Sequence, residues 1–245
     1  MARPCEVAAF KLSKGHASLI TSLGFVAVAD GGGTAEILRN VGSELSVFDR
    51  TIDLMILTAI EPNRIVGLIE LMNKYPVYTL LLPSWSKATS TKELKELQET
   101  AFENGVPVLY AQAPADFHFA HGLSIKLLAP TRTYEPSKKE LMSQVFSLEC
   151  NESSVLFLSK STKRLQKFVV ETLNDKKYKT IIHHTTGAAS LFYDGIITVF
   201  NPDTIVYSKK IVKKSIAMPE ASEIDTSIAG IKFLNIAEKM VRLIP

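Results

Sequence analysis

The sequence predicts a four-layer αββα sandwich of the mixed α/β class, in which helices cover the outer faces of two stacked β-sheets. Three observations carry this prediction. Short runs of β-branched and aliphatic residues alternate with segments of helical spacing. A hairpin–helix–strand unit occurs twice along the chain. The 245 residues are 46% hydrophobic, which suits one large domain with a well-buried core.

The first half of the chain is predicted to form two opening strands followed by alternating helices and strands. The segment 54–57 is an almost continuous apolar run, as expected of a strand that is covered on both faces. A helix that follows it should end before Pro76, because the residue preceding a proline disfavours α geometry. Gly105 is the expected C-cap of the next helix. The expected strands are 18–20, 25–28, 54–57, 77–82 and 108–111, and the expected helices begin near 34 and cover 65–74 and 91–104.

The second half repeats the opening of the first. Strands at 146–150 and 155–158 flank a polar turn, and a helix at 161–173 leads to a strand at 180–182. Each half therefore places one loop after its second strand and another after its third. In an αββα sandwich such loops gather at one sheet edge, where site residues lie. The alternative is a coincidence between two common supersecondary units.

We expect a single domain over residues 1–245, with a first half at 1–115, a second half at 116–208 and a C-terminal extension at 209–245. Within the extension, residues 228–244 have the apolar spacing of an amphipathic helix that docks on its own domain. Its apolar stripe comprises Ile231, Leu234, Ile236, Met240 and Leu243.

Composition excludes several classes of protein. The 28 basic and 25 acidic residues give a formal charge of +3, which is too small to identify a nucleic-acid binder by charge alone. Cys5 and Cys150 fit neither a disulfide framework nor a zinc knuckle. No stretch has the pattern of a signal peptide or a membrane span. We expect a soluble chain, cytoplasmic if it is complete and extracytoplasmic if it is a domain of a membrane protein.

Several short runs are informative through their order and spacing. They are Ser-Leu-Ile at 18–20, Val-Ala-Asp-Gly-Gly at 28–32, Ile-Asp-Leu-Met-Ile-Leu-Thr at 52–58, Ile-Ile-His-His at 181–184 and Asn-Pro-Asp-Thr-Ile-Val-Tyr-Ser at 201–208. From about residue 7 to residue 208 the chain resembles the metallo-β-lactamase superfamily, and within it the C-terminal hydrolase-like domain of ComEC-type competence proteins. The resemblance implies the αββα fold, zinc or manganese in active relatives, and a link to bacterial DNA uptake. It also implies nucleic acid or a membrane competence protein as partner.

The residues that would hold the metal ions depart from the family pattern. In active members the strand ending in Leu-Thr is followed by His-Pro-Asp-x-Asp-His, whereas this chain has Ala59, Ile60, Glu61, Pro62, Asn63 and Arg64 in turn. Ala59 offers no ligand atom, Arg64 has no lone pair to donate, and Asn63 is a weak substitute for a carboxylate. Where the family's second hairpin ends in Gly-Asp, this chain has Ser159 and Lys160. The pattern therefore predicts no metal cofactor and no metal-dependent hydrolysis.

Four residues of the site survive: Asp30, Glu61, His183 and His184. Asp30 suits a turn or helix-cap role before the glycines that follow it, because aspartate readily accepts local backbone hydrogen bonds. The two histidines suit a hydrogen-bonded remnant of an ancestral site. The alternative is a rearranged or mononuclear metal site that uses all four residues.

Two cations, Arg64 and Lys160, fall where the metal ions of the family would supply positive charge. With backbone N–H groups around Gly31 and Gly32, they could bind a phosphate or carboxylate. The alternative is an internal salt bridge to Asp30 or Glu61. The sequence thus favours a catalytically inactive binding or structural module. The alternatives are a metal-dependent hydrolase with a rearranged site and an interaction domain of a membrane competence apparatus.

Overall fold

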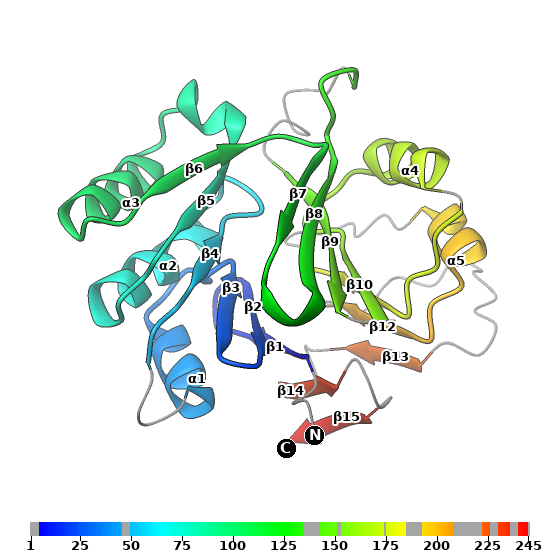
Figure 1. The fold of residues 1–245 in the computed structure, drawn as a ribbon, viewed down its shortest axis with the longest axis horizontal. Helices are drawn as coiled ribbons and strands as arrows, with labels where there is room; N and C mark the ends of the chain where they lie inside the picture. Colours follow the sequence, from blue (N-terminus) through cyan, green and yellow to red (C-terminus); the bar gives the residue numbers. More distant parts are fainter. Residues whose placement is uncertain are drawn as a thin grey trace. The chain divides into compact units, whose positions relative to one another are not determined.

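The computed structural model describes residues 5–45, 50–134, 143–150, 153–173, 175–184, 193–207, 222–225, 230–235 and 240–244. The chain divides into two compact units, each built around one β-sheet (Figure 1). The first unit comprises residues 1–111 and 230–244, and the second comprises residues 112–229. None of the helices within the described ranges is long and apolar enough to cross a membrane.

The described part of the first unit forms an eight-stranded sheet in the order β15-β14-β1-β2-β3-β4-β5-β6. Neighbouring strands are antiparallel from β15 to β3 and parallel from β3 to β6. The strands are β1 (Glu6–Lys11), β2 (His16–Ser22), β3 (Phe25–Ala29), β4 (Leu54–Ile56), β5 (Leu80–Pro83), β6 (Val108–Ala111), β14 (Gly230–Asn235) and β15 (Met240–Ile244).

Helices connect the parallel strands of the first unit and cover one face of its sheet (Figure 1). They are α1 (Glu36–Glu44), α2 (Pro62–Lys74) and α3 (Lys92–Glu103), and the short 3₁₀ helix η1 (Ser84–Lys87) follows β5. Each helix buries a stripe at helical spacing, such as Leu94, Leu97 and Ala101 of α3, against strand residues such as Met55 and Leu80. Parallel strands align their carboxyl ends, so the loops after β3 and β4 start at the same edge of the sheet.

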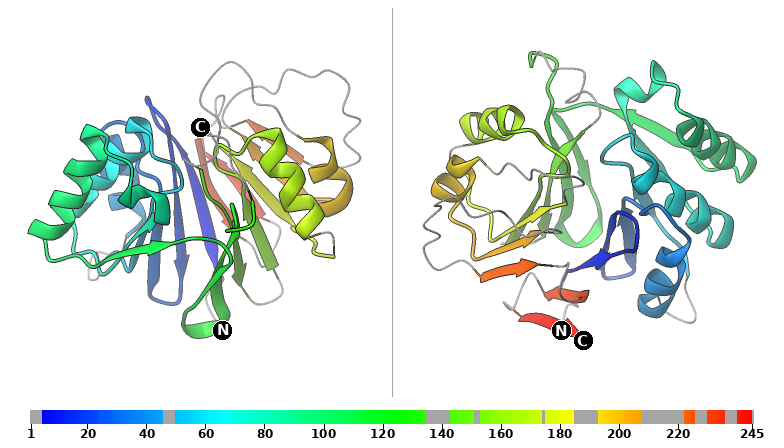
Figure 2. Two further views of the ribbon diagram at one scale, coloured as in Figure 1. Left: turned by 90° about the horizontal axis from the view of Figure 1, so that it is seen from above. Right: turned by 180° about the vertical axis from the view of Figure 1, so that it is seen from behind.

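The described part of the second unit forms a seven-stranded sheet in the order β13-β12-β11-β10-β9-β8-β7. One face packs against α4 and α5 through a core that includes Leu156, Leu165, Ile181 and Phe200 (Figure 2). The elements are β7 (Ala115–His118), the 3₁₀ helix η2 (Ala120–Gly122), β8 (Leu123–Ala129), β9 (Val145–Cys150), β10 (Ser153–Phe157), α4 (Lys163–Thr172), β11 (Thr180–His183), α5 (Asp194–Phe200), β12 (Thr204–Tyr207) and β13 (Ser222–Asp225).

Strand pairing confirms the predicted internal repeat. In the first unit β2 and β3 are antiparallel, and α1 leads to β4, which is parallel to β3. In the second unit β9 and β10 are antiparallel, and α4 leads to β11, which is parallel to β10. One backbone bond extends each parallel ladder past the second strand: Asp30 N–H donates to Ile56 O at 2.9 Å, and Leu158 N–H donates to Ile182 O at 2.9 Å.

The predicted C-terminal amphipathic helix at 228–244 is wrong, because residues 230–235 and 240–244 form strands β14 and β15. β14 pairs antiparallel with β1, in a register that sets Glu6 opposite Asn235 and Val7 opposite Leu234. Without β14, the backbone N–H and C=O groups along that side of β1 would lack a strand partner. Short apolar runs fit helical and extended templates alike, and the distant partner strand decides between them. Ile236, a member of the predicted stripe, lies outside the described residues.

Candidate functional site

A cluster of polar side chains lies at the carboxyl edge of β3 and β4 in the first unit. Asp30 directly follows β3, Thr58 follows β4 by two residues, and Glu61 is the N-cap residue of α2. Arg64 belongs to the first turn of α2 and is 1% exposed. The parallel pairing of β3 with β4 brings these residues together, although Asp30 and Arg64 are far apart in sequence.

A buried ion pair joins Arg64 to Asp30. Arg64 Nη1 donates to Asp30 Oδ2, and it also lies 3.0 Å from Thr58 Oγ1. Thr58 supplies two further donors to the carboxylate, from its N–H to Oδ1 at 2.8 Å and from its Oγ1 to Oδ2 at 2.7 Å. Arg64 Nε lies 3.3 Å from Glu61 Oε2, which makes a second ion pair. The guanidinium is therefore held between two carboxylates.

Burial dominates the electrostatics of this cluster. Burial raises the pKa of the Asp30 carboxyl above its ordinary value, while the charge of Arg64 and the hydrogen bonds from Thr58 oppose that rise. Arginine remains protonated in proteins, so the buried positive charge on Arg64 is permanent. Removing one partner of such a pair leaves an uncompensated buried charge, which typically costs about 3–5 kcal/mol.

Two glycines, which have no side chain, allow the loop after β3 to pack closely against α2. A Cβ on Gly31 would lie 2.2 Å from Leu68 N, and a Cβ on Gly67 would lie 1.8 Å from Gly31 O, so backbone meets backbone here. Gly31 N–H donates to Arg64 O at 2.8 Å, and Gly67 N–H donates to Gly32 O at 3.1 Å. The amide of Gly31 thus binds a carbonyl of α2, which fixes the loop that carries Asp30.

Two further residues of the predicted site take packing positions. Ala59 is fully buried, and its methyl group offers no ligand atom. Asn63 lies in the first turn of α2, where a Cβ on Gly15 would come within 1.9 Å of Asn63 O. Gly15 therefore allows the turn after β1 to approach the start of α2 closely.

Lys160, His183 and His184 belong to the second unit. Lys160 is exposed, and it follows Ser159, which has a left-handed φ of 50°. His183 is the last residue of β11 and His184 follows it, and both are buried. Because β10 and β11 are parallel, Lys160 and the two histidines lie at the same edge of the second sheet.

The residues at the β3–β4 edge do not fit a divalent metal ion. Both oxygens of Asp30 already accept hydrogen bonds, Ala59 has no donor atom, and the Arg64 guanidinium carries positive charge where a cation would need ligands. In the ranges that the structure describes, no three histidine, cysteine, aspartate or glutamate side chains form a group that could hold a metal ion. The cluster has the chemistry of a closed internal ion network.

Asp30, Glu61 and Arg64 are predicted from the sequence as site residues, whereas the hydrogen bonds of Thr58 are not. The sequence does hold a signal for Thr58. It is a hydroxyl-bearing residue directly after an apolar strand, as Asp30 is a carboxylate directly after the neighbouring strand. Asp30 has a left-handed φ of 61°, which short polar residues tolerate better than branched ones. Thr58 donates hydrogen bonds to the Asp30 carboxylate from both its N–H and its hydroxyl group.

Neither a scan against protein-family models nor a search of curated proteins found a match. The fold is similar to that of several solved structures. The metallo-β-lactamase fold protein YhfI from Bacillus subtilis matches with a TM-score of 0.61 and 10% identity, over 91% of this chain and 95% of that one. Tm1679, a metal-dependent hydrolase of the β-lactamase superfamily, matches with a TM-score of 0.57 and 12% identity, over 83% and 87% of the two chains.

A diphosphatase of the PhnP family also matches, with a TM-score of 0.53 and 10% identity, over 83% of this chain and 85% of that one. Likeness at this level of identity establishes the fold alone. It confirms the predicted fold class, the metallo-β-lactamase fold.

Proposed function

We propose that this chain is a metal-independent protein of the metallo-β-lactamase fold that acts as a binding or structural module. One observation carries the proposal: buried Arg64 holds the carboxylates of Asp30 and Glu61, which are among the residues that could otherwise have bound a metal ion.

The chemistry of guanidinium supports the absence of hydrolysis. A catalytic metal ion accepts a lone pair from water and lowers the pKa of that water, which generates the attacking hydroxide. Arg64 supplies positive charge, but it has no empty coordination position and cannot activate water in this way. Its burial between carboxylates also keeps it from meeting a substrate. Of the two cations named from the sequence, Lys160 is the exposed one and is the candidate for contact with an anionic ligand.

The proposed link to DNA uptake rests on the sequence resemblance to ComEC-type domains between about residues 7 and 208. The runs Val-Ala-Asp-Gly-Gly at 28–32 and Ile-Ile-His-His at 181–184 carry much of it. Within this proposal the module binds nucleic acid or a membrane competence protein. Fluorescence anisotropy with labelled single-stranded and double-stranded DNA tests the nucleic-acid branch, and Lys160→Ala should weaken any binding that uses this edge of the second sheet.

The second candidate is a metal-dependent hydrolase with a rearranged site. The observation that favours it is the adjacent pair His183 and His184, buried at the carboxyl edge of β11. Neutral imidazole is a common metal ligand, and such a site would need further donors beside the pair.

Metal analysis separates the two candidates. We expect protein purified without chelator to carry no stoichiometric zinc or manganese, and added metal should bind wild type and a His183→Ala/His184→Ala variant equally weakly. We also expect no hydrolysis of bis(p-nitrophenyl) phosphate with either metal present. About one tightly bound ion per chain that is lost in the double variant would overturn the proposal in favour of the hydrolase.

A further inference from the structure

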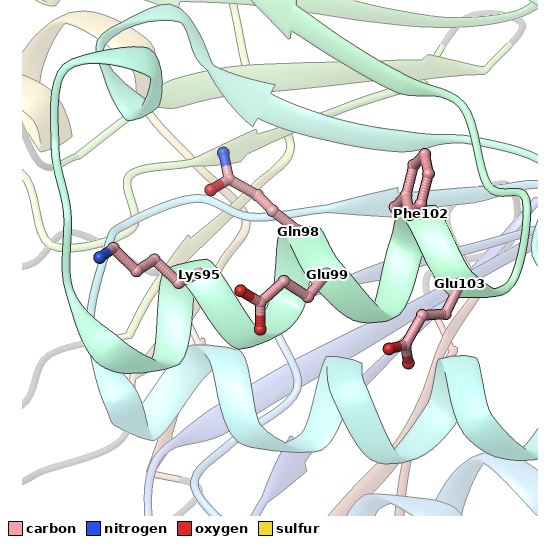
Figure 3. A pocket seen from close by; sticks show the side chains of 5 residues that line it. All are labelled: Lys95, Gln98, Glu99, Phe102 and Glu103. Atoms are coloured by element: carbon pink, nitrogen blue, oxygen red, sulfur yellow. The ribbon is translucent and has the colours of Figure 1, made fainter.

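The outer face of α3 carries an ordered set of exposed side chains. Lys92, Lys95, Glu99 and Phe102 are all exposed and follow one another at intervals of three, four and three residues, so they form one stripe along the helix. Phe102 is 87% exposed, the largest value among the exposed large hydrophobic residues of the described chain. Figure 3 shows Lys95, Glu99 and Phe102 projecting from α3 around a shallow hollow.

The order of charges on this stripe is less favourable within a single helix than the reverse order would be. The two lysines stand at the N-terminal end, where the helix dipole favours acidic groups, and Glu99 stands toward the C-terminal end, where it favours basic ones. Lys95 also precedes Glu99 by four residues, which is the weaker orientation for such a pair. Stability of the isolated helix alone would favour the reverse order.

We propose that this face of α3 is an interface between two copies of this chain, related by a two-fold axis that sets the two α3 helices antiparallel. The intervals of three, four and three residues are palindromic, so an antiparallel copy meets the stripe in register. Lys95 then faces Glu99 of the partner, and Glu99 faces the partner's Lys95. At each end Lys92 lies against the ring of the partner's Phe102, a cation–π arrangement that also covers the exposed ring.

The order of charges along the α3 stripe favours a second copy of this chain over an unrelated partner. A two-fold axis requires every contact to occur twice with the partners exchanged, and this stripe satisfies that condition with two ion pairs and two cation–π contacts. A parallel pairing would set Lys95 against Lys95 and Glu99 against Glu99. The stripe is thus complementary to its own reverse.

Sedimentation velocity over a range of protein concentrations tests the interface. We expect a weak dimer whose dissociation constant rises by about tenfold or more in Phe102→Lys, because this change removes the exposed ring and sets a lysine against the partner's Lys92. Tyr78→Ser and Lys74→Glu remove another exposed aromatic and another exposed lysine of the same unit, and both should leave the dimer intact. A wild-type chain that stays monomeric at every concentration would overturn the proposal, as would a dimer that Phe102→Lys leaves unchanged.

Charge exchange gives a test that does not depend on Phe102. Lys95→Glu alone sets two glutamates against each other at both symmetric positions, and Glu99→Lys alone sets two lysines against each other, so each variant should be monomeric. A mixture of the two variants should form a heterodimer, because each ion pair is restored between unlike chains. The double variant should again self-associate. Failure of the mixture to associate, with both chains folded by circular dichroism, would refute the antiparallel register.

Discussion

Arg64 and Lys160 both follow parallel strands of the chain, in the first and the second unit respectively, yet one side chain is buried and the other is exposed. Arg64 lies between Asp30 and Glu61 and receives its compensating charge from the protein. Lys160 is exposed, so water screens its charge. A cation that follows a parallel strand is therefore expected to matter for stability mainly where it is buried beside carboxylates.

The largest effect that separates the two cations should follow from Arg64→Ala. This change leaves the buried carboxylate of Asp30 with Thr58 as its remaining donor residue in the cluster, so we expect a loss of about 3–5 kcal/mol in the free energy of unfolding. Urea denaturation measures it. Lys160→Ala is the matched control, and its effect should stay within about 0.5 kcal/mol. Equal effects of the two substitutions would contradict the distinction drawn between the cations.

A second substitution tests the backbone packing that holds the Asp30 loop. Gly67→Ala would place a Cβ 1.8 Å from Gly31 O, a backbone atom that cannot move aside as the end of a flexible side chain could. We expect about 1–3 kcal/mol of destabilisation or more, because the loop and α2 must separate. Gly42→Ala in α1 is the control, since its Cβ would approach only the hydroxyl of Tyr75, at 2.9 Å, and alanine improves helix propensity. Thermal unfolding of both variants should show a clear loss only for Gly67→Ala.

Partly exposed charges in the second unit should contribute less. Glu149 lies 2.6 Å from Lys126 Nζ and 2.8 Å from Lys176 Nζ. Partial burial raises the pKa of Glu149, but the two ammonium groups more than offset this, so its pKa lies below the ordinary value. A lowered pKa means that the stabilisation is present at neutral pH and is lost as pH falls through the titration of the carboxyl.

We therefore expect Glu149→Gln to cost at most about 1 kcal/mol at pH 7 in low salt. The difference from wild type should shrink in acid and in high salt, because protonation and screening remove the same interaction. Urea denaturation at pH 7 and in acid, and at pH 7 in low and in high salt, measures both changes. A difference that grows as pH falls would contradict the assigned direction of the Glu149 pKa.

Part of the fold was predictable from the pattern of neighbouring residues, although the expected strands did not include β1, β7 or β8. Alternating apolar runs marked the strands of both hairpins, and the spacing of Leu94, Leu97 and Ala101 marked α3. The C-terminal strands were not predictable in this way, because β14 finds its partner β1 at the opposite end of the sequence. The short apolar run of β14 does not reveal that β1, far away in the sequence, has an unpaired edge available for it.

For the candidate site too, only part could be predicted from the sequence. Sequence supplied Asp30, Glu61 and Arg64 as members, since their residue types stand at strand ends, and left open whether Arg64 would meet a ligand or a carboxylate. Whether Arg64 contacts a ligand or a carboxylate depends on its burial and on the direction of its side chain. The left-handed backbone of Asp30 and the first turn of α2 set these directions, and neither can be read from residue type.

The smallest expected effect concerns metal removal. If Arg64 supplies the positive charge at the β3–β4 edge, chelator removes nothing that stabilises the native state, so EDTA should leave the melting temperature unchanged. An ion bound to the native state adds a free energy that grows with the ratio of its concentration to its dissociation constant, so its removal lowers the melting temperature by a measurable amount. A drop of several degrees on adding EDTA, reversed by zinc, would show that a metal ion binds. Repeating the melt with His183→Ala/His184→Ala then locates it: a drop that disappears in this variant shows that these two histidines hold the ion.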